Sequence, residues 1–265
     1  MATPLQVEDH RIAHPRGRLF ARSWAAAGAA ARRAPIVLLH DSLGCVELWR
    51  DFPAALCEAT GRRVVAYDRL GFGRSDVRDG PMPPDFIADE ASRFFPVVLQ
   101  ALGMRRFVAF GHSVGGGMAV NCAARWADDC EALVTVSAQA FVEDRTVQGL
   151  RVAREQFKEP AQMQRLARYH GDKAAWVLEA WLGTWLSAEF AGWSLEGVLP
   201  RVRCPALAIH GADDEYGSPA HPALIAARAG APVRIELLAQ TGHVPHRERP
   251  EAVLEAVAAL LASAG

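Results

Sequence analysis

The fold of this chain is indicated most directly by Phe107-Val108-Ala109-Phe110-Gly111-His112-Ser113-Val114-Gly115-Gly116. It begins with a short apolar run and continues into a helix-like pattern, with Ser113 between two glycines at the junction. A serine in such a strand-to-helix turn has a strained backbone that exposes its hydroxyl group. Gly111 and Gly115 leave room for neighbouring segments to approach. The pattern predicts that Ser113 is a nucleophile at the end of a buried strand.

Short apolar runs bounded by Gly, Pro or charged residues recur along the chain, with helix-like stretches between them. Strands that are apolar throughout are typical of parallel sheets covered by helices. The alternation therefore predicts an α/β fold with a doubly wound, mostly parallel sheet. The predicted strands cover residues 36–39, 64–67, 107–110, 133–136, 206–209 and 233–238; the helices cover 49–59, 85–102, 116–127, 220–229 and 250–262. Residues 7–13 and 19–24 are expected to form an antiparallel entry pair before a flexible stretch, 25–31.

Residues 141–199 interrupt this alternation, because they contain no convincing strand and are expected to form several short helices. We therefore expect a core domain of residues 1–140 and 200–265 and a helical cap of residues 141–199. The segment holds four of the seven tryptophans, Trp176, Trp181, Trp185 and Trp193. Trp181 and Trp185 lie one helical turn apart and would share a face. That face could pack on the core domain, line a substrate pocket, or do both.

A serine nucleophile needs a general base, and the base needs an acid that orients it. His210-Gly211-Ala212-Asp213-Asp214-Glu215 and Thr241-Gly242-His243 follow the predicted strands 206–209 and 233–238. Carboxyl ends of parallel strands are where such sheets assemble their ligand sites. The candidate acids are Asp213, Asp214 and Glu215, and the candidate bases are His243 and His246. The H-x-x-H spacing of these histidines would also fit a metal site, but the serine pattern argues against that reading.

The reaction would also need an oxyanion hole, formed by two backbone N–H groups. One donor is expected from Val114, directly after the nucleophile, and the other from the loop after strand 36–39. That loop reads His40-Asp41-Ser42-Leu43-Gly44.

These motifs resemble those of the α/β-hydrolase superfamily, and the resemblance covers nearly the whole chain. By the superfamily's G-x-x-D turn the acid is Asp214, with Asp213 the alternative, and by its G-H pair the base is His243. By its His-Gly motif the donor is Ser42, with Leu43 the alternative, although Asp41 replaces the usual glycine. The segments that carry a narrower likeness to bacterial capped hydrolases are Tyr169-His170-Gly171-Asp172, Asp213-Asp214-Glu215-Tyr216-Gly217 and Gly242-His243-Val244-Pro245-His246-Arg247.

We therefore expect a serine hydrolase that acts through an acyl-enzyme, with no cofactor and no metal. The Trp-rich cap and the apolar balance of the chain favour a small, fairly apolar carboxylic ester or lactone as the substrate. The alternatives are a thioesterase or a C–C bond hydrolase of ring-fission products, and, from a different class, a low-turnover ligand receptor. The residues expected to line the substrate pocket are Leu43, His112, Trp176, Trp181, Trp185 and His246.

The composition of the 265-residue chain indicates which classes of partner to expect. With 29 basic and 30 acidic residues its formal net charge is −1, which gives no reason to expect a nucleic-acid partner. Residues 1–10 include Glu8 and Asp9 and no signal-peptide pattern, and no apolar run is long enough to span a bilayer. Five scattered cysteines fit reduced, mostly buried thiols. We expect a cytoplasmic protein with a small-molecule substrate and no membrane association, and the sequence is compatible with a homo-oligomer.

Overall fold

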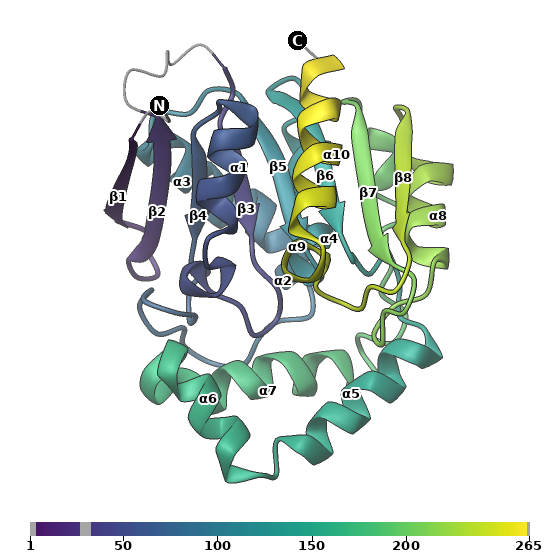
Figure 1. Ribbon diagram of the computed structural model, residues 1–265. Coiled ribbons are helices and arrows are strands. Elements are labelled where there is room, and N and C mark those ends of the chain that lie inside the picture. Colours follow the sequence, from purple (N-terminus) through teal and green to yellow (C-terminus); the bar gives the residue numbers. More distant parts are fainter. Residues whose placement is uncertain (1–3, 27–32, 264–265) are drawn as a thin grey trace.

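The computed structural model describes residues 4–26 and 33–263. Its centre is an eight-stranded sheet with the order β1-β2-β4-β3-β5-β6-β7-β8 (Figure 1). The strands are β1 (Leu5–Ile12), β2 (Leu19–Ala26), β3 (Ile36–Leu39), β4 (Val64–Tyr67), β5 (Phe107–His112), β6 (Cys130–Val136), β7 (Ala206–Gly211) and β8 (Val233–Leu238). Most of the predicted flexible stretch 25–31 lies outside the described residues.

The strands in the centre of the sheet are parallel and buried, as their apolar sequences predict. From β4 to β8 every neighbouring pair is parallel, whereas β1 pairs antiparallel with β2 and β2 antiparallel with β4. The central strands β3, β4 and β5 are buried along their whole length, as expected for strands covered on both faces. The predicted doubly wound, mostly parallel sheet and its antiparallel entry pair are confirmed.

Helices cover both faces of the sheet. One apolar core lies between the sheet and α1 and α10, and a second lies between the sheet and α2, α3, α4 and α8. The α-helices are α1 (Phe52–Thr60), α2 (Phe86–Asp89), α3 (Phe95–Ala101), α4 (Val114–Arg125), α5 (Asp144–Gln156), α6 (Pro160–His170), α7 (Ala174–Trp185), α8 (Ala220–Arg228), α9 (Pro245–Glu248) and α10 (Pro250–Ser263). Short 3₁₀ helices lie at Val46–Trp49, Gly171–Lys173 and Leu199–Arg201.

The predicted helix 85–102 differs from the structure, in which a π-helical turn, Glu90–Phe94, separates α2 from α3. Pro96 lies just after this turn. Proline has no N–H to donate to the carbonyl four residues earlier, so the regular α-helical ladder cannot continue through it. Glu90, the first residue of this turn, accepts a 2.6 Å hydrogen bond from Tyr67 Oη in the core.

Helices α5, α6 and α7 gather at one end of the sheet (Figure 1). The chain leaves the sheet after β6, and the points where it leaves and returns lie side by side, because Phe141 and Ser194 form an antiparallel bridge. Next to it, Leu195 N donates to Ala140 O at 2.7 Å. The helical segment 141–199, which was expected to lack strands, therefore has its two ends joined at the carboxyl end of the parallel strands.

All five cysteines are buried free thiols, and Cys130 and Cys204 have their Sγ atoms 3.6 Å apart. Within the described ranges, 4–26 and 33–263, no helix has both the length and the hydropathy to cross a membrane.

Candidate active site

The turn at Ser113 has the strain that the sequence predicted. β5 ends at His112, and Ser113 adopts φ 55° and ψ −126° before α4 begins at Val114. The backbone segments around this turn approach too closely for any residue but glycine at positions 111 and 115. A Cβ atom on Gly111 would lie 2.0 Å from Gly115 O, and a Cβ atom on Gly115 would lie 2.1 Å from Leu39 O. The backbone therefore holds Ser113 at the carboxyl end of β5 and the N-terminus of a 12-residue helix.

His243 and Asp214 meet across the ends of β7 and β8. His243 Nδ1 lies 2.9 Å from both carboxylate oxygens of Asp214. The carboxylate is fully buried and is fixed by the N–H groups of Tyr216 and Gly217, which donate to its Oδ1 at 2.8 and 3.1 Å. Asp213 is exposed. Of the two aspartates, the structure brings Asp214 to the imidazole.

The electrostatics of this pair favour a carboxylate beside a proton-accepting imidazole. Burial alone would raise the pKa of Asp214, but the hydrogen bond and charge of His243 lower it to about 2. Burial alone would lower the pKa of His243, but the hydrogen bond to Asp214 and the nearby negative charges raise it above 6.5. Because Nδ1 faces Asp214, the ring nitrogen left to accept a proton is Nε2.

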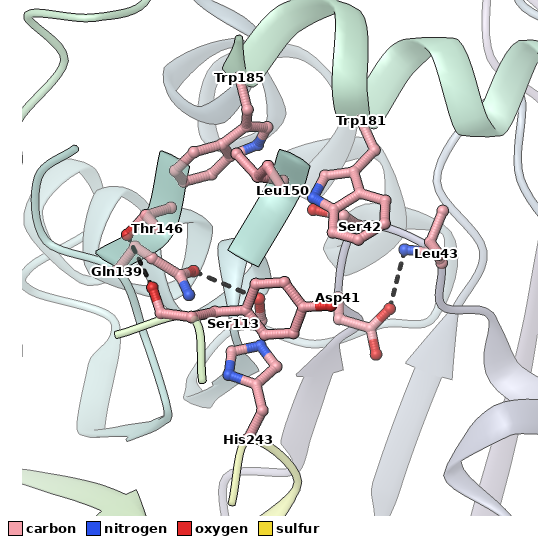
Figure 2. Close-up of a pocket in the computed structure, with 11 residues that line it drawn as sticks. Asp41, Ser42, Leu43, Ser113, Gln139, Thr146, Leu150, Trp181, Trp185 and His243 are labelled. Atoms are coloured by element: carbon pink, nitrogen blue, oxygen red, sulfur yellow. Dashed lines mark hydrogen bonds between the residues drawn. The ribbon is translucent and has the colours of Figure 1, made fainter. Parts of the chain in front are cut away.

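Ser113 and His243 line one cavity of about 160 Å³. Figure 2 shows both side chains at its floor, with Gln139 beside Ser113. In this structure Ser113 Oγ donates to Gln139 Oε1 at 3.2 Å, and the described residues show no hydrogen bond between Ser113 and His243. Rotation about the Cα–Cβ bond would be needed to turn the hydroxyl group to the imidazole.

The backbone N–H groups of the loop after β3 differ in whether they are already hydrogen-bonded. Leu43 N–H is already bound to Asp41 Oδ1 at 2.9 Å, and Gly44 N–H donates to Asp41 O. Ser42 lines the cavity, and its N–H has no hydrogen bond to any described residue. Val114 N–H opens helix α4, where the first N–H groups lack an intrahelical acceptor. The N–H groups of Ser42 and Val114 therefore have no acceptor among the described residues.

The cavity walls combine residues of the core with residues of α5 and α7. Of the residues expected there, Leu43, Trp181 and Trp185 line it. Sequence reasoning missed Gln139, Thr146, Leu150 and Tyr216, which complete the wall. Two features of the sequence could have predicted these wall residues. Thr146 and Leu150 have the i, i+4 spacing of one helix face, and Tyr216 lies two residues after Asp214. Among the described residues that line the cavity, none is Lys or Arg.

Trp176, His112 and His246, which were expected at the pocket, lie outside it. Trp176 packs over Phe72 at 5.6 Å between ring centroids, and its Nε1 donates to Gly80 O. His246 is buried between Trp49 and Phe52, and His112 lies beneath the turn, with its ring 4.7 Å from that of His246. These positions correct the expectation: on α7, Trp176 and Trp181 are five residues apart, so they point in different directions.

The sequence matches the model of a known family, described as the alpha/beta hydrolase fold, over residues 34–179. It is 30% identical over 186 residues to the human protein named serine hydrolase BPHL, which covers 68% of this chain and 62% of that protein. It is also 30% identical to the Bos taurus (lyso)-N-acylphosphatidylethanolamine lipase over 109 residues, or 41% of this chain. That match spans about a third, 31%, of the lipase.

Among solved structures, the enol-lactonase from Burkholderia xenovorans LB400 superposes with a TM-score of 0.73 at 22% identity. The match covers 96% of this chain and all of that one. At this identity the likeness is one of fold, and it extends over the whole architecture in Figure 1.

Proposed function

The chain belongs to the alpha/beta hydrolase fold family, and on that premise we propose that it is a serine hydrolase of small carboxylic esters or lactones. The observation that carries the proposal is the pairing of Asp214 with Nδ1 of His243, which lines the same cavity as Ser113 on its strained turn. Its similarity to a human protein named serine hydrolase adds support.

In the proposed reaction Ser113 Oγ attacks the substrate carbonyl carbon while its proton moves to His243 Nε2. The N–H groups of Ser42 and Val114 stabilise the negative charge on the carbonyl oxygen. The carbon–oxygen bond to the alcohol breaks, and His243 returns the proton to the leaving oxygen. Water then attacks the acyl-enzyme with His243 as the base, which releases the acid and restores Ser113. Asp214 holds the imidazole in the productive tautomer and stabilises its protonated form.

The walls of the cavity favour a small and uncharged acyl group. Leu43, Leu150, Trp181 and Trp185 provide apolar surface, and Gln139 provides an amide beside the nucleophile. Asp41 and Asp214 are carboxylates near the base, and no cation lines the described wall. A free carboxylate on the substrate would therefore lose its hydration without gaining a counter-ion.

The cap is part of this proposal: residues 141–199 form it, and it bounds the size of the acyl group. In support, Thr146 and Leu150 of α5 and Trp181 and Trp185 of α7 belong to the cavity wall. The joined ends of the segment at Phe141 and Ser194 fit an insertion into the core domain.

A screen of the purified protein against short-chain p-nitrophenyl esters, lactones, thioesters and dienoate ring-fission products tests the proposal, with Ser113→Ala as control. We expect turnover of neutral esters or lactones that Ser113→Ala abolishes. Turnover of thioesters or dienoates alone would move the assignment to those reactions. Stoichiometric labelling of Ser113 by a fluorophosphonate without turnover of any substrate would favour a ligand receptor.

A further inference from the structure

His112, the residue before Ser113, lies between two hydrogen-bond acceptors. Its Nε2 is 2.8 Å from the backbone oxygen of His243, and its Nδ1 is 3.2 Å from Asp41 Oδ2. The ring is 2% exposed, whereas the side chain of Asp41 is 27% exposed, so the imidazole itself is shielded from water. A backbone oxygen can only accept, which means that Nε2 must carry a hydrogen.

Three other buried histidines have a different pattern of partners. His170 accepts from Gly73 N–H at Nδ1 and donates from Nε2 to Leu43 O. His221 likewise accepts from Ala140 N–H and donates to Glu143. His40 donates from Nδ1 to Asp41 O and accepts from Arg69 N–H. One donor and one acceptor suit a neutral imidazole. His112 alone among these four faces an acceptor at both nitrogens.

A neutral His112 with its hydrogen on Nε2 would present the lone pair of Nδ1 to a carboxylate oxygen, which is repulsive at 3.2 Å. One additional proton between Nδ1 and Asp41 removes this repulsion. Asp41 Oδ1 already accepts the N–H of Leu43 at 2.9 Å, and an imidazole is ordinarily a stronger base than a carboxylate. The additional proton therefore belongs on the imidazole.

The same carboxylate also holds the loop that carries Ser42. Asp41 Oδ1 accepts the N–H of Leu43 at 2.9 Å, while Oδ2 faces His112. Through His112 Nε2 the contacts continue to the backbone of His243. One chain of polar contacts thus joins the loop after β3, the end of β5 and the loop after β8, which supply the proposed oxyanion donor, nucleophile and base.

We propose that His112 is a buried imidazolium ion-paired with Asp41, and that the pair positions Ser42 N–H and His243 relative to Ser113. Its effect on catalysis rests on the proposed function, whereas its charge state does not. The rings of His243 and His246 have centroids 5.1 and 4.7 Å from that of His112. The other titratable groups that line the same small space are His40, Cys45 and Arg247. Asp41 is the anion in direct contact with the His112 ring.

The charge state is tested by ¹H–¹⁵N NMR of the imidazole nitrogens at pH 7.5, where histidines with an ordinary pKa near 6.5 are mostly neutral. We expect His112 to show two protonated nitrogens with similar shifts, and His112→Gln to remove that signal. The widely separated pair of shifts of a neutral ring would overturn the proposal. If His112→Gln does not fold, Asp41→Asn supplies the assignment, because it should convert the same signal to the neutral pattern.

The positioning role is tested by a matched pair of variants. In Asp41→Asn the introduced amide can accept from Leu43 N–H and donate to a neutral His112, so the contacts persist without charge. Asp41→Ala removes them. We expect Asp41→Ala to lower kcat by about 10²-fold with a small change in KM, and Asp41→Asn to keep kcat within about tenfold. Equal kcat for Asp41→Ala and the wild type, with wild-type turnover intact, would refute positioning. Absence of wild-type turnover would instead count against the proposed function.

Discussion

Ser113 Oγ donates to Gln139 Oε1 at 3.2 Å, and this contact, rather than one with His243, holds the hydroxyl group in the resting site. A neutral hydrogen bond contributes about 0.5–1.5 kcal/mol, so Gln139 competes with His243 for the hydroxyl hydrogen without trapping it. The contact leads to the first prediction.

Gln139→Met removes the amide at nearly constant volume and should raise the rate of fluorophosphonate labelling of Ser113. From the strength of one hydrogen bond, the increase should be about 2- to 10-fold. Labelling kinetics followed by intact-protein mass measure it, with melting temperature as the check on folding. A slower reaction in a well-folded variant would mean that Gln139 assists the attack or holds the substrate.

Ser113 should carry the covalent adduct. A fluorophosphonate is expected to add one label per chain on the peptide that contains Ser113, and Ser113→Ala should lose about 10⁴-fold or more in kcat. Peptide mapping and ester turnover measure the two effects. Labelling of another residue, or full turnover by Ser113→Ala, would reject the proposed nucleophile.

Asp214→Asn should reduce kcat by about 10⁴-fold, because the amide would favour the wrong tautomer of His243. Its matched control is Asp213→Asn, which changes an exposed neighbour and should retain near-normal kcat. Steady-state kinetics of both variants decide the point. The opposite ranking would assign the orienting role to Asp213.

The rate of labelling of Ser113 should rise with pH through the pKa of His243, because only the neutral imidazole accepts a proton. Asp214 raises that pKa above 6.5 against the effect of burial, so the midpoint of the acid limb should lie above 6.5. Asp214→Asn leaves the burial and removes the carboxylate, so the midpoint should fall. Labelling rates from pH 5 to 9 test this, and an unchanged midpoint in the variant would contradict it.

Trp181→Ala should enlarge the cavity and shift kcat/KM towards bulkier acyl groups, since Trp181 lines the wall. Trp176→Ala is the matched control from the same helix. It should cost about 1.5–3 kcal/mol of stability through lost packing on Phe72, with the acyl preference unchanged. An acyl-chain series and thermal melts separate the two variants. If Trp181→Ala leaves the chain-length profile unaltered, other residues limit the acyl group.

Two features could be predicted from the residues alone: the alternation of buried strands and helices, and the strained turn at Ser113. Both depend on short-range rules: apolar runs suit strands covered on both faces, and only glycine at 111 and 115 permits the close backbone approach. The order of Ser113, Asp214 and His243 along the chain could also be read from motifs. Their proximity could be expected because the carboxyl ends of parallel strands lie at one edge of a sheet.

Which side chains meet at that edge depends on how the sheet and its loops are assembled. Gln139 follows a different strand from Ser113, and no local pattern predicts their contact. The partners of His112 come from the loops after β3 and β8, so its two acceptors appear only when the sheet is assembled. Trp176 and Trp181 look alike in sequence, but the direction of a side chain from α7 depends on how the helix docks, which is a property of long-range packing.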